Sequence, residues 1–147
     1  MSPLSNTEKF SPKQRRQSRR ALLQALYQWD LARSGEADLH QFMMDEGSLA
    51  KADKKYFTQC LQGILRSVQD LDRTYEPYLD RSFDDITPVE RACLRAGSFE
   101  LLEREDVPTT VVINEWVELA KLFGAQDSFR YINAVLDAVA RSARETS

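Results

Sequence analysis

The chain has 147 residues, two cysteines and a formal net charge of −3 at pH 7. A chain of this length forms one domain or two small subdomains and buries roughly 68–70% of its unfolded surface, so it can fold without disulfides or metal ions. No apolar run approaches the roughly 18 residues of a membrane span, and the first residues lack the apolar stretch of an export signal, so we expect a cytoplasmic protein.

The first helix is predicted from its start and stop signals. Ser11, Pro12 and Gln14 are suited to the N-cap, N1 and N3 positions of a helix. We therefore expect a helix over residues 12–34, which Gly35 can end.

Two further helices are expected before Pro77. The first covers residues 36–46 and is followed by the helix-breaking pair Gly47 and Ser48. Over residues 52–76 apolar residues recur every three or four positions, which is the spacing of an amphipathic helix. Pro77 ends this third helix.

The second half of the chain begins with capping residues. Thr87, Pro88 and Glu90 form a capping box with proline at N1. They predict a helix that continues through Leu102. Pro108 separates it from the next helix.

Two helices are expected after that proline. One covers residues 110–123, with Gly124 as a left-handed cap, and Asp127 can N-cap a last helix that reaches about Ala143. The triplet at 111–113 is strand-like but too short to build a sheet.

The helix pattern predicts an all-α fold. Three helices precede the joint at residues 78–86 and three follow it, so two packed three-helix bundles are the simplest architecture. We place them at residues 1–82 and 83–147 and expect them to form one compact unit.

Charge is segregated along the chain. The first 20 residues contain six basic residues and one acidic residue, a net charge of +5, which leaves −8 for the remainder. Four of the basic residues are Arg15, Arg16, Arg19 and Arg20, at the start of the first helix. At about 100° per residue, leucines of the later turns fall on the same side as these arginines. We expect none of these arginines to belong to the core. The first two turns should project beyond the packed body, or lie along its edge, and present several guanidinium groups to an anion such as nucleic acid, although a solvated charged terminus is the simpler alternative.

Catalytic, metal-binding and cofactor-binding patterns are absent from the sequence. Cys60 and Cys93 lie within apolar helical patterns, without CxxC or CxxH spacing, and are expected to be buried and unpaired. The single histidine, His40, has no nucleophile near it in sequence and is expected to be structural. Phosphate loops, dinucleotide-binding motifs, hydrolase elbows and zinc-protease motifs are all missing, so we expect neither an enzyme nor a cofactor or metal.

Six sequence blocks carry a family resemblance. They are QALYQW at 24–29, PYL at 77–79, VERACLR at 89–95, VVINEWVELAK at 111–121, FGAQDS at 123–128 and INAVLD at 132–137. Together, at this spacing and over nearly the whole chain, they resemble the NusB family of transcription antitermination factors.

The resemblance implies an all-α fold of two helical bundles and an RNA-binding function. Members of the family bind the boxA element of nascent ribosomal RNA transcripts as a heterodimer with the ribosomal protein NusE. The pair joins elongating RNA polymerase with other Nus factors and suppresses termination. Arginine suits RNA because its planar fork binds phosphate oxygens and stacks on unpaired bases.

The resemblance also implies which residues meet RNA. Arg15, Arg16 and Arg19 align with the basic turn of the family, whereas Arg20 stands where relatives can carry an acidic residue. A second group near the joint and the start of the last helix comprises Tyr78, Arg81, Asp127, Arg130 and Tyr131. Exposed aromatic rings there could stack on bases of single-stranded RNA. For two of these residues a structural role is an alternative: Asp127 could cap a helix, and Tyr78 could cover the bundle joint.

The partner surface is implied to lie on the second bundle, at Asp84 and Glu90. Acidic residues suit a basic ribosomal protein, because complementary charge speeds association. The capping box gives Glu90 an alternative, structural role.

Two positions depart from the family pattern. Trp116 stands where relatives often have a small residue, and Ala134 where glycine is usual. We expect the apolar side of the 110–123 helix, Trp116 included, to belong to the core.

Two other classes of function remain open from the sequence. A helical adaptor could use the arginines to bind an acidic protein and not RNA. RNA cytosine methyltransferases carry a NusB-like domain, but the sequence lacks their cofactor-binding region and catalytic cysteine motif. Whether the protein is a monomer or a homodimer cannot be read from the chain.

Overall fold

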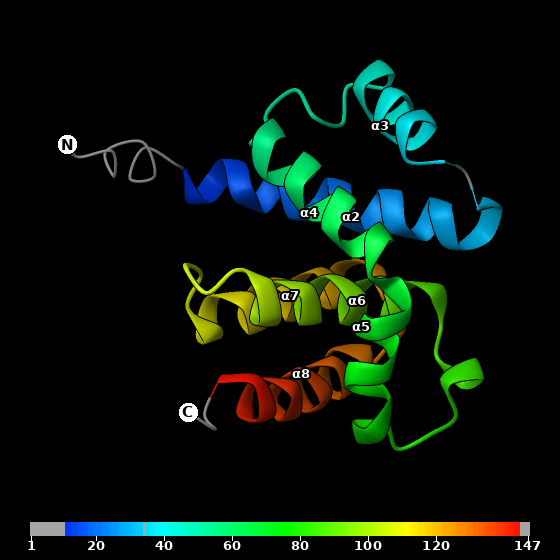
Figure 1. Cartoon of the computed structure of the whole chain (residues 1–147), viewed down its shortest axis with the longest axis vertical. Coiled ribbons are helices and arrows are strands. Elements are labelled where there is room, and N and C mark those ends of the chain that lie inside the picture. Colours follow the sequence, from blue (N-terminus) through cyan, green and yellow to red (C-terminus); the bar gives the residue numbers. More distant parts are fainter. Residues whose placement is uncertain (1–10, 34, 145–147) are drawn as a thin grey trace.

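The computed structural model describes residues 11–33 and 35–144. In these residues seven α-helices, two short 3-10 helices and no strand are found, so the predicted all-α class is confirmed (Figure 1). The α-helices are α2 (Pro12–Ala32), α3 (Glu36–Asp45), α4 (Lys54–Arg66), α5 (Val68–Tyr75), α6 (Pro88–Glu103), α7 (Thr109–Phe123) and α8 (Ser128–Arg144). The 3-10 helices η1 (Glu76–Tyr78) and η2 (Phe83–Asp85) lie in the joint.

Helix α2 begins as predicted and ends slightly earlier. The Ser11 hydroxyl oxygen accepts a hydrogen bond from the Gln14 backbone N–H at 3.1 Å. At the other end Arg33 adopts a left-handed conformation (φ 56°), and its N–H donates to the Trp29 carbonyl. Gly35 is therefore not the residue that ends α2; it is extended and precedes α3.

The single helix predicted over residues 52–76 is wrong, because the chain forms α4 and α5 there. Ser67 interrupts the helix with φ −123° and ψ 24°. Its hydroxyl donates to the Gly63 carbonyl at 2.7 Å, which gives the backbone an alternative to regular helix geometry. Helix α4 also starts later than predicted, because Asp53 is its N-cap and accepts from the Tyr56 N–H at 3.0 Å.

Helix α6 lies at the centre of the fold. The predicted capping box is present: the Glu90 N–H donates to the Thr87 hydroxyl and the Thr87 N–H donates to the Glu90 carboxylate. Residues 92–101 are all buried. In Figure 1, α2 and α4 lie above α6 and α8 lies below it, while α7 contacts α6, α8 and α2. Helix α8 packs closely against Gly97: a Cβ atom there would lie 2.7 Å from a methyl carbon of Leu136, so that side chain would have to move.

One hydrophobic core runs through both halves of the chain. It joins apolar side chains of α2, α4 and α5 to those of α6, α7 and α8. Trp116 is fully buried in it, as predicted, so the tryptophan does not alter the outer surface of α7. Cys60 and Cys93 are buried and free, and burial raises the pKa of each thiol to about 12. The division of the chain at residues 82 and 83 stays a prediction.

Candidate nucleic-acid interface

The four arginines at the start of α2 differ in their surroundings. Arg16 and Arg20 are exposed, whereas Arg19 is only 2% exposed and the side chain of Arg15 is 12% exposed. The expectation that none of these arginines belongs to the core is therefore wrong for Arg19. The body of the protein supplies carboxylates that pair with them, and the pairing permits burial.

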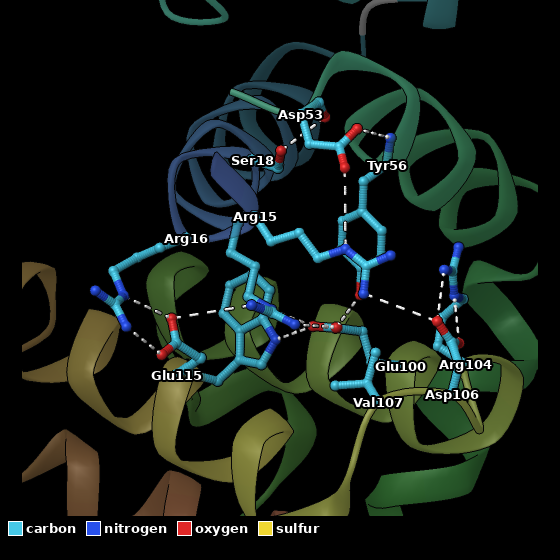
Figure 2. Close-up of polar contacts among 12 residues, drawn as sticks. Arg15, Arg16, Ser18, Asp53, Tyr56, Glu100, Arg104, Asp106, Val107 and Glu115 are labelled. Atoms are coloured by element: carbon cyan, nitrogen blue, oxygen red, sulfur yellow. Dashed lines mark hydrogen bonds and ion pairs between the residues drawn. The ribbon is translucent and has the colours of Figure 1, made fainter. Parts of the chain in front are cut away.

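Arg19 is held in a buried network around Glu100. Its Nε donates to Oε1 of Glu100 at 2.9 Å and its Nη2 donates to Oε2 at 2.8 Å. Trp116 Nε1 donates to the same carboxylate at 2.7 Å, and the Tyr56 hydroxyl donates to it as well. Figure 2 shows Tyr56 beside the start of α2 and Glu100 below it. This two-point charged pair fixes α2 against α6.

The pKa values in this network follow from the pairing. Burial alone would lower the pKa of Arg19, but the hydrogen bonds and charge of Glu100 outweigh it and raise the pKa above its ordinary value. Burial, reinforced by the charge of Glu100, also raises the pKa of Tyr56. The guanidinium is therefore charged and the phenol protonated at neutral pH.

Arg15 lies over an aromatic ring on the side facing α4. Its guanidinium carbon is 4.2 Å from the centre of the Tyr56 ring, and Arg104 lies 4.7 Å from the same ring. Arg15 also forms ion pairs with Asp53 at 3.9 Å and Asp106 at 3.8 Å (Figure 2). Most of its side chain is covered by these contacts.

Arg16 is exposed and forms a two-point contact with α7. Its Nε and Nη2 each donate to an oxygen of Glu115 at 3.2 Å (Figure 2). The hydrogen bonds and charge of this carboxylate raise the pKa of Arg16. The outer part of the guanidinium remains in solvent, since the side chain is 60% exposed.

Arg20 lies at the edge of a groove between α2, α6 and α7. Its guanidinium carbon is 4.9 Å from the centre of the Phe123 ring. The groove has a volume of about 360 Å³ and is lined by Arg20, Leu23, Gln24, Tyr27, Val89 and Phe123. Tyr27 and Phe123 are 40% and 43% exposed. Exposed aromatic rings beside an arginine are suited to stacking on unpaired bases.

The second predicted group gathers where the joint meets α8. Arg81 lies 4.1 Å from the centre of the Tyr131 ring, and its Nε donates to Asp80 at 3.0 Å. Burial raises the pKa of Tyr131, so its phenol is protonated at neutral pH. Tyr78 is 40% exposed in η1, which packs on α8. Tyr78 therefore offers an open ring surface, while the Tyr131 ring is already stacked on an arginine.

The turn between α7 and α8 differs from the predicted caps. Gly124 has φ −89°, so it is not a left-handed cap; it is needed because a Cβ atom would lie 2.7 Å from the Ala120 carbonyl oxygen. Asp127, the predicted N-cap, directly precedes α8 but is left-handed (φ 71°), whereas N-cap residues are typically extended. Its carboxylate lies 3.6 Å from Nε of Arg130, and both side chains are exposed.

The two residues assigned to the partner surface have different environments. Asp84 is exposed in η2. Glu90 is 5% exposed, and its second oxygen accepts from the Ser128 hydroxyl at 2.8 Å. The carboxylate of Glu90 is therefore used by the capping box and by the start of α8, which favours the structural alternative, and its partner role stays a prediction.

Sequence reasoning missed the acidic residues that face the basic turn. Glu100 and Glu115 were not singled out as its partners, although Glu100 follows Cys93 and Ala96 at buried helical spacing. A carboxylate within an apolar stripe signals a buried cationic partner. Nε2 of His40 lies 3.0 Å from the Thr58 hydroxyl oxygen, and its expected structural role stays a prediction. Within residues 11–33 and 35–144 no three side chains form a possible metal site, and no helix there is long and apolar enough to cross a membrane.

Comparison with known proteins shows the family. A sequence profile of the NusB family matches residues 16–141. The transcription antitermination protein NusB of Alcanivorax borkumensis is 51% identical over 134 residues, which cover 91% of this chain and 89% of the relative. NusB of Pseudoalteromonas translucida is 44% identical over 136 residues, which cover 92% of this chain and 100% of the relative.

Solved structures agree with the sequence comparison. NusB of T. maritima superposes with a TM-score of 0.78 at 31% identity, covering 89% of this chain and 94% of that one. A structure of antitermination factors NusB and NusE in complex with double-stranded RNA contains a chain with a TM-score of 0.82 at 25% identity, covering 90% of this chain and 99% of that one. On these matches, this chain belongs to the NusB family of transcription antitermination proteins.

Proposed function

We propose that this protein binds the boxA element of nascent ribosomal RNA transcripts together with the ribosomal protein NusE, and so suppresses termination by RNA polymerase with other Nus factors. The observation that carries this proposal is the match to a chain solved with NusE and RNA. Family membership makes the protein an antitermination factor and not an enzyme. Action on nascent transcripts implies a cytoplasmic location.

The first part of the proposed RNA surface is the exposed side of α2 with the adjoining groove. Arg16 and Arg20 reach phosphates, while Tyr27 and Phe123 stack on bases. The buried Arg19 supports this surface by fixing the helix that carries them.

The second part lies at the joint and the start of α8. Tyr78 supplies an exposed ring, and Arg81 and Arg130 supply positive charge. The stacking of Arg81 on Tyr131 leaves the guanidinium exposed and aligned for a phosphate. RNA that reached both parts would cross the turn between α7 and α8, because Phe123 and Asp127 lie at the two sides of that turn.

The proposed NusE surface is acidic and includes Asp84. Asp84 and Asp85 are exposed in η2, directly before α6. A basic ribosomal protein would be attracted by such a surface. Glu90 contributes indirectly, because its capping box fixes the start of α6 next to η2.

The proposal is tested by fluorescence anisotropy of a short boxA-type RNA and a shuffled RNA, with and without NusE, over a series of salt concentrations. We expect selective binding that tightens with NusE. Arg16→Ala and Arg20→Ala should each weaken binding and reduce the salt slope by about 0.7, the value for one lost contact to single-stranded RNA.

Arg141→Ala is the matched control, because Arg141 is exposed on α8 and its ion pair with Asp137, at 2.7 Å, is local. A duplex of the same sequence tests whether the single-stranded form is required. If boxA-type and shuffled RNA bind equally, or neither binds with NusE present, the RNA function is wrong. The adaptor function would then be favoured, since Arg16 already binds a carboxylate within this chain.

A further inference from the structure

Glu115 is an acidic residue placed directly at the proposed RNA surface. It lies on α7, and its side chain is 18% exposed, whereas that of Arg16 is 60% exposed. Its oxygens accept from Nε and Nη2 of Arg16, each at 3.2 Å, and Oε1 lies 3.9 Å from Nη1 of Arg19. A negative charge at this position opposes the binding of any polyanion, so its presence calls for a physical reason.

The pairing leaves one edge of the Arg16 guanidinium available. A guanidinium has five N–H donors, and Glu115 takes one on Nε and one on Nη2. The two donors on Nη1 and the second donor on Nη2 face away from the carboxylate. Within the described part of the chain no further hydrogen bond to Arg16 is formed. This outer edge matches the two-point geometry of a phosphate.

Both members of the pair are attached to fixed parts of the fold. Trp116, next to Glu115, is fully buried in the core. Arg19, one turn after Arg16, is bound at two points by Glu100. Both backbones are therefore fixed, and the two-point contact with Glu115 orients the outer edge of Arg16.

We propose that Glu115 is a selectivity-determining residue, which directs Arg16 towards a phosphate at one place on the surface and repels RNA bound in other registers. The inference rests on the proposed RNA function. A phosphate in the correct register meets the outer edge and gains a two-point contact. A phosphate in another register meets the carboxylate or a guanidinium turned away from it. Glu115 thus weakens non-selective binding more than selective binding.

The test is Glu115→Gln, which removes the charge and keeps the size of the side chain. With NusE present, shuffled RNA should bind about two- to fivefold more tightly, the range of one exposed charge interaction. Its salt slope should become steeper by up to about 0.7, because Arg16 is released to neutralise phosphates in any register. BoxA-type RNA should change less, so the ratio of the two affinities falls.

Glu118→Gln is the matched control. Glu118 lies three residues later on α7, its side chain is 67% exposed, and it pairs with Lys121 at 3.1 Å. The substitution makes the same change in net charge without removing the hydrogen-bond partner of Arg16. It should leave the affinity ratio at the wild-type value.

A double-mutant cycle shows whether Glu115 acts through Arg16. In an Arg16→Ala background, Glu115→Gln should no longer change the affinity ratio. A purely structural role would instead appear as an equal loss for both RNAs and a lower midpoint of thermal unfolding.

The outcomes separate this inference from the function on which it rests. If the wild-type protein does not distinguish the two RNAs, the proposed function fails and the inference falls with it. If the wild type is selective but Glu115→Gln keeps or raises the ratio, only the role of Glu115 is wrong. The same conclusion follows if Glu118→Gln lowers the ratio equally.

Discussion

At the scale of single residues, one carboxylate connects four helices. Glu100 of α6 accepts hydrogen bonds from Arg19 of α2, Tyr56 of α4 and Trp116 of α7. The carboxylate is fully buried, and the guanidinium of Arg19 is paired with it at 2.8 Å. Burying such a pair is costly, so the pair itself adds little net stability. Removing one partner is strongly destabilising, because the other charge is left buried and unpaired.

Glu100→Ala should lower the free energy of unfolding by about 3–5 kcal/mol, because it leaves Arg19 charged and unpaired in the core. Denaturant unfolding followed by circular dichroism measures this loss. Glu118→Ala, at an exposed position, should change the same quantity by less than about 0.5 kcal/mol. A loss below about 1 kcal/mol for Glu100→Ala would contradict this prediction, because Arg19 would then not be left charged and unpaired in the core.

The arginine cluster also shows which site features a sequence can predict. The position of the cluster at the start of α2 follows from helix-start signals and local charge. The exposure of each arginine does not, because Glu100 and Glu115 lie 81 and 99 residues away along the chain from their partners. Long-range pairing of this kind is decided by packing and leaves no local pattern at the arginines themselves.

At the scale of secondary structure, N-cap side chains explain where three of the seven described α-helices begin, namely α2, α4 and α6. Ser11 and Thr87 cap α2 and α6 as predicted. Each cap could be predicted because the cap residue and the residues of its first turn lie within four positions of one another. The break at Ser67 was missed because apolar spacing continues from α4 into α5 and masks it. The cap expected at Gly124 failed because the glycine serves a close approach between backbone atoms and not a left-handed turn.

A side chain of α8 binds backbone carbonyls at the C-terminal end of α6. The Arg144 guanidinium donates at 2.8 to 3.1 Å to four backbone carbonyls, those of Glu100, Leu101, Arg104 and Val107. It also donates to the Thr109 hydroxyl at 3.1 Å. The last carbonyls of a helix lack partners within the helix, and a guanidinium has enough donors to satisfy several of them.

Arg144→Ala should therefore lower the free energy of unfolding by about 1.5–3 kcal/mol, the range for hydrogen bonds that involve a charged group. Arg141→Ala on the same helix removes only a surface ion pair and should cost less than about 1 kcal/mol. Chemical denaturation of the two variants compares these values directly. Equal effects would show that the contacts at the end of α6 contribute little.

At the scale of the whole molecule, the two halves of the chain share one core. The all-α class and the order of helices in the second half could be predicted, because they depend on local periodicity and caps. The central position of α6 could not, since its nearly uniform burial comes from contacts with helices on both sides. Sequence pattern alone does not show that one helix packs against two layers.

The shared core predicts a single cooperative unfolding transition. Tryptophan fluorescence and far-UV circular dichroism should report the same midpoint, and residues 1–82 expressed alone should not form a stable fold, because α6 would be missing from their core. Amide proton dispersion in NMR spectra of that fragment provides the second measurement. Two separate transitions, or a folded fragment, would show that the halves are independent bundles.

Trp116 donates a hydrogen bond to Glu100, so the fluorescence of its indole reports on the position of α2 relative to α6. The ring lies in an apolar, fully buried site beside a balanced pair of charges. When α2 moves away from α6, Arg19 leaves and the carboxylate beside the indole becomes unbalanced. Emission from Trp116 in a Trp29→Phe variant would therefore distinguish a ligand that only covers the outer surface of α2 from one that loosens the helix.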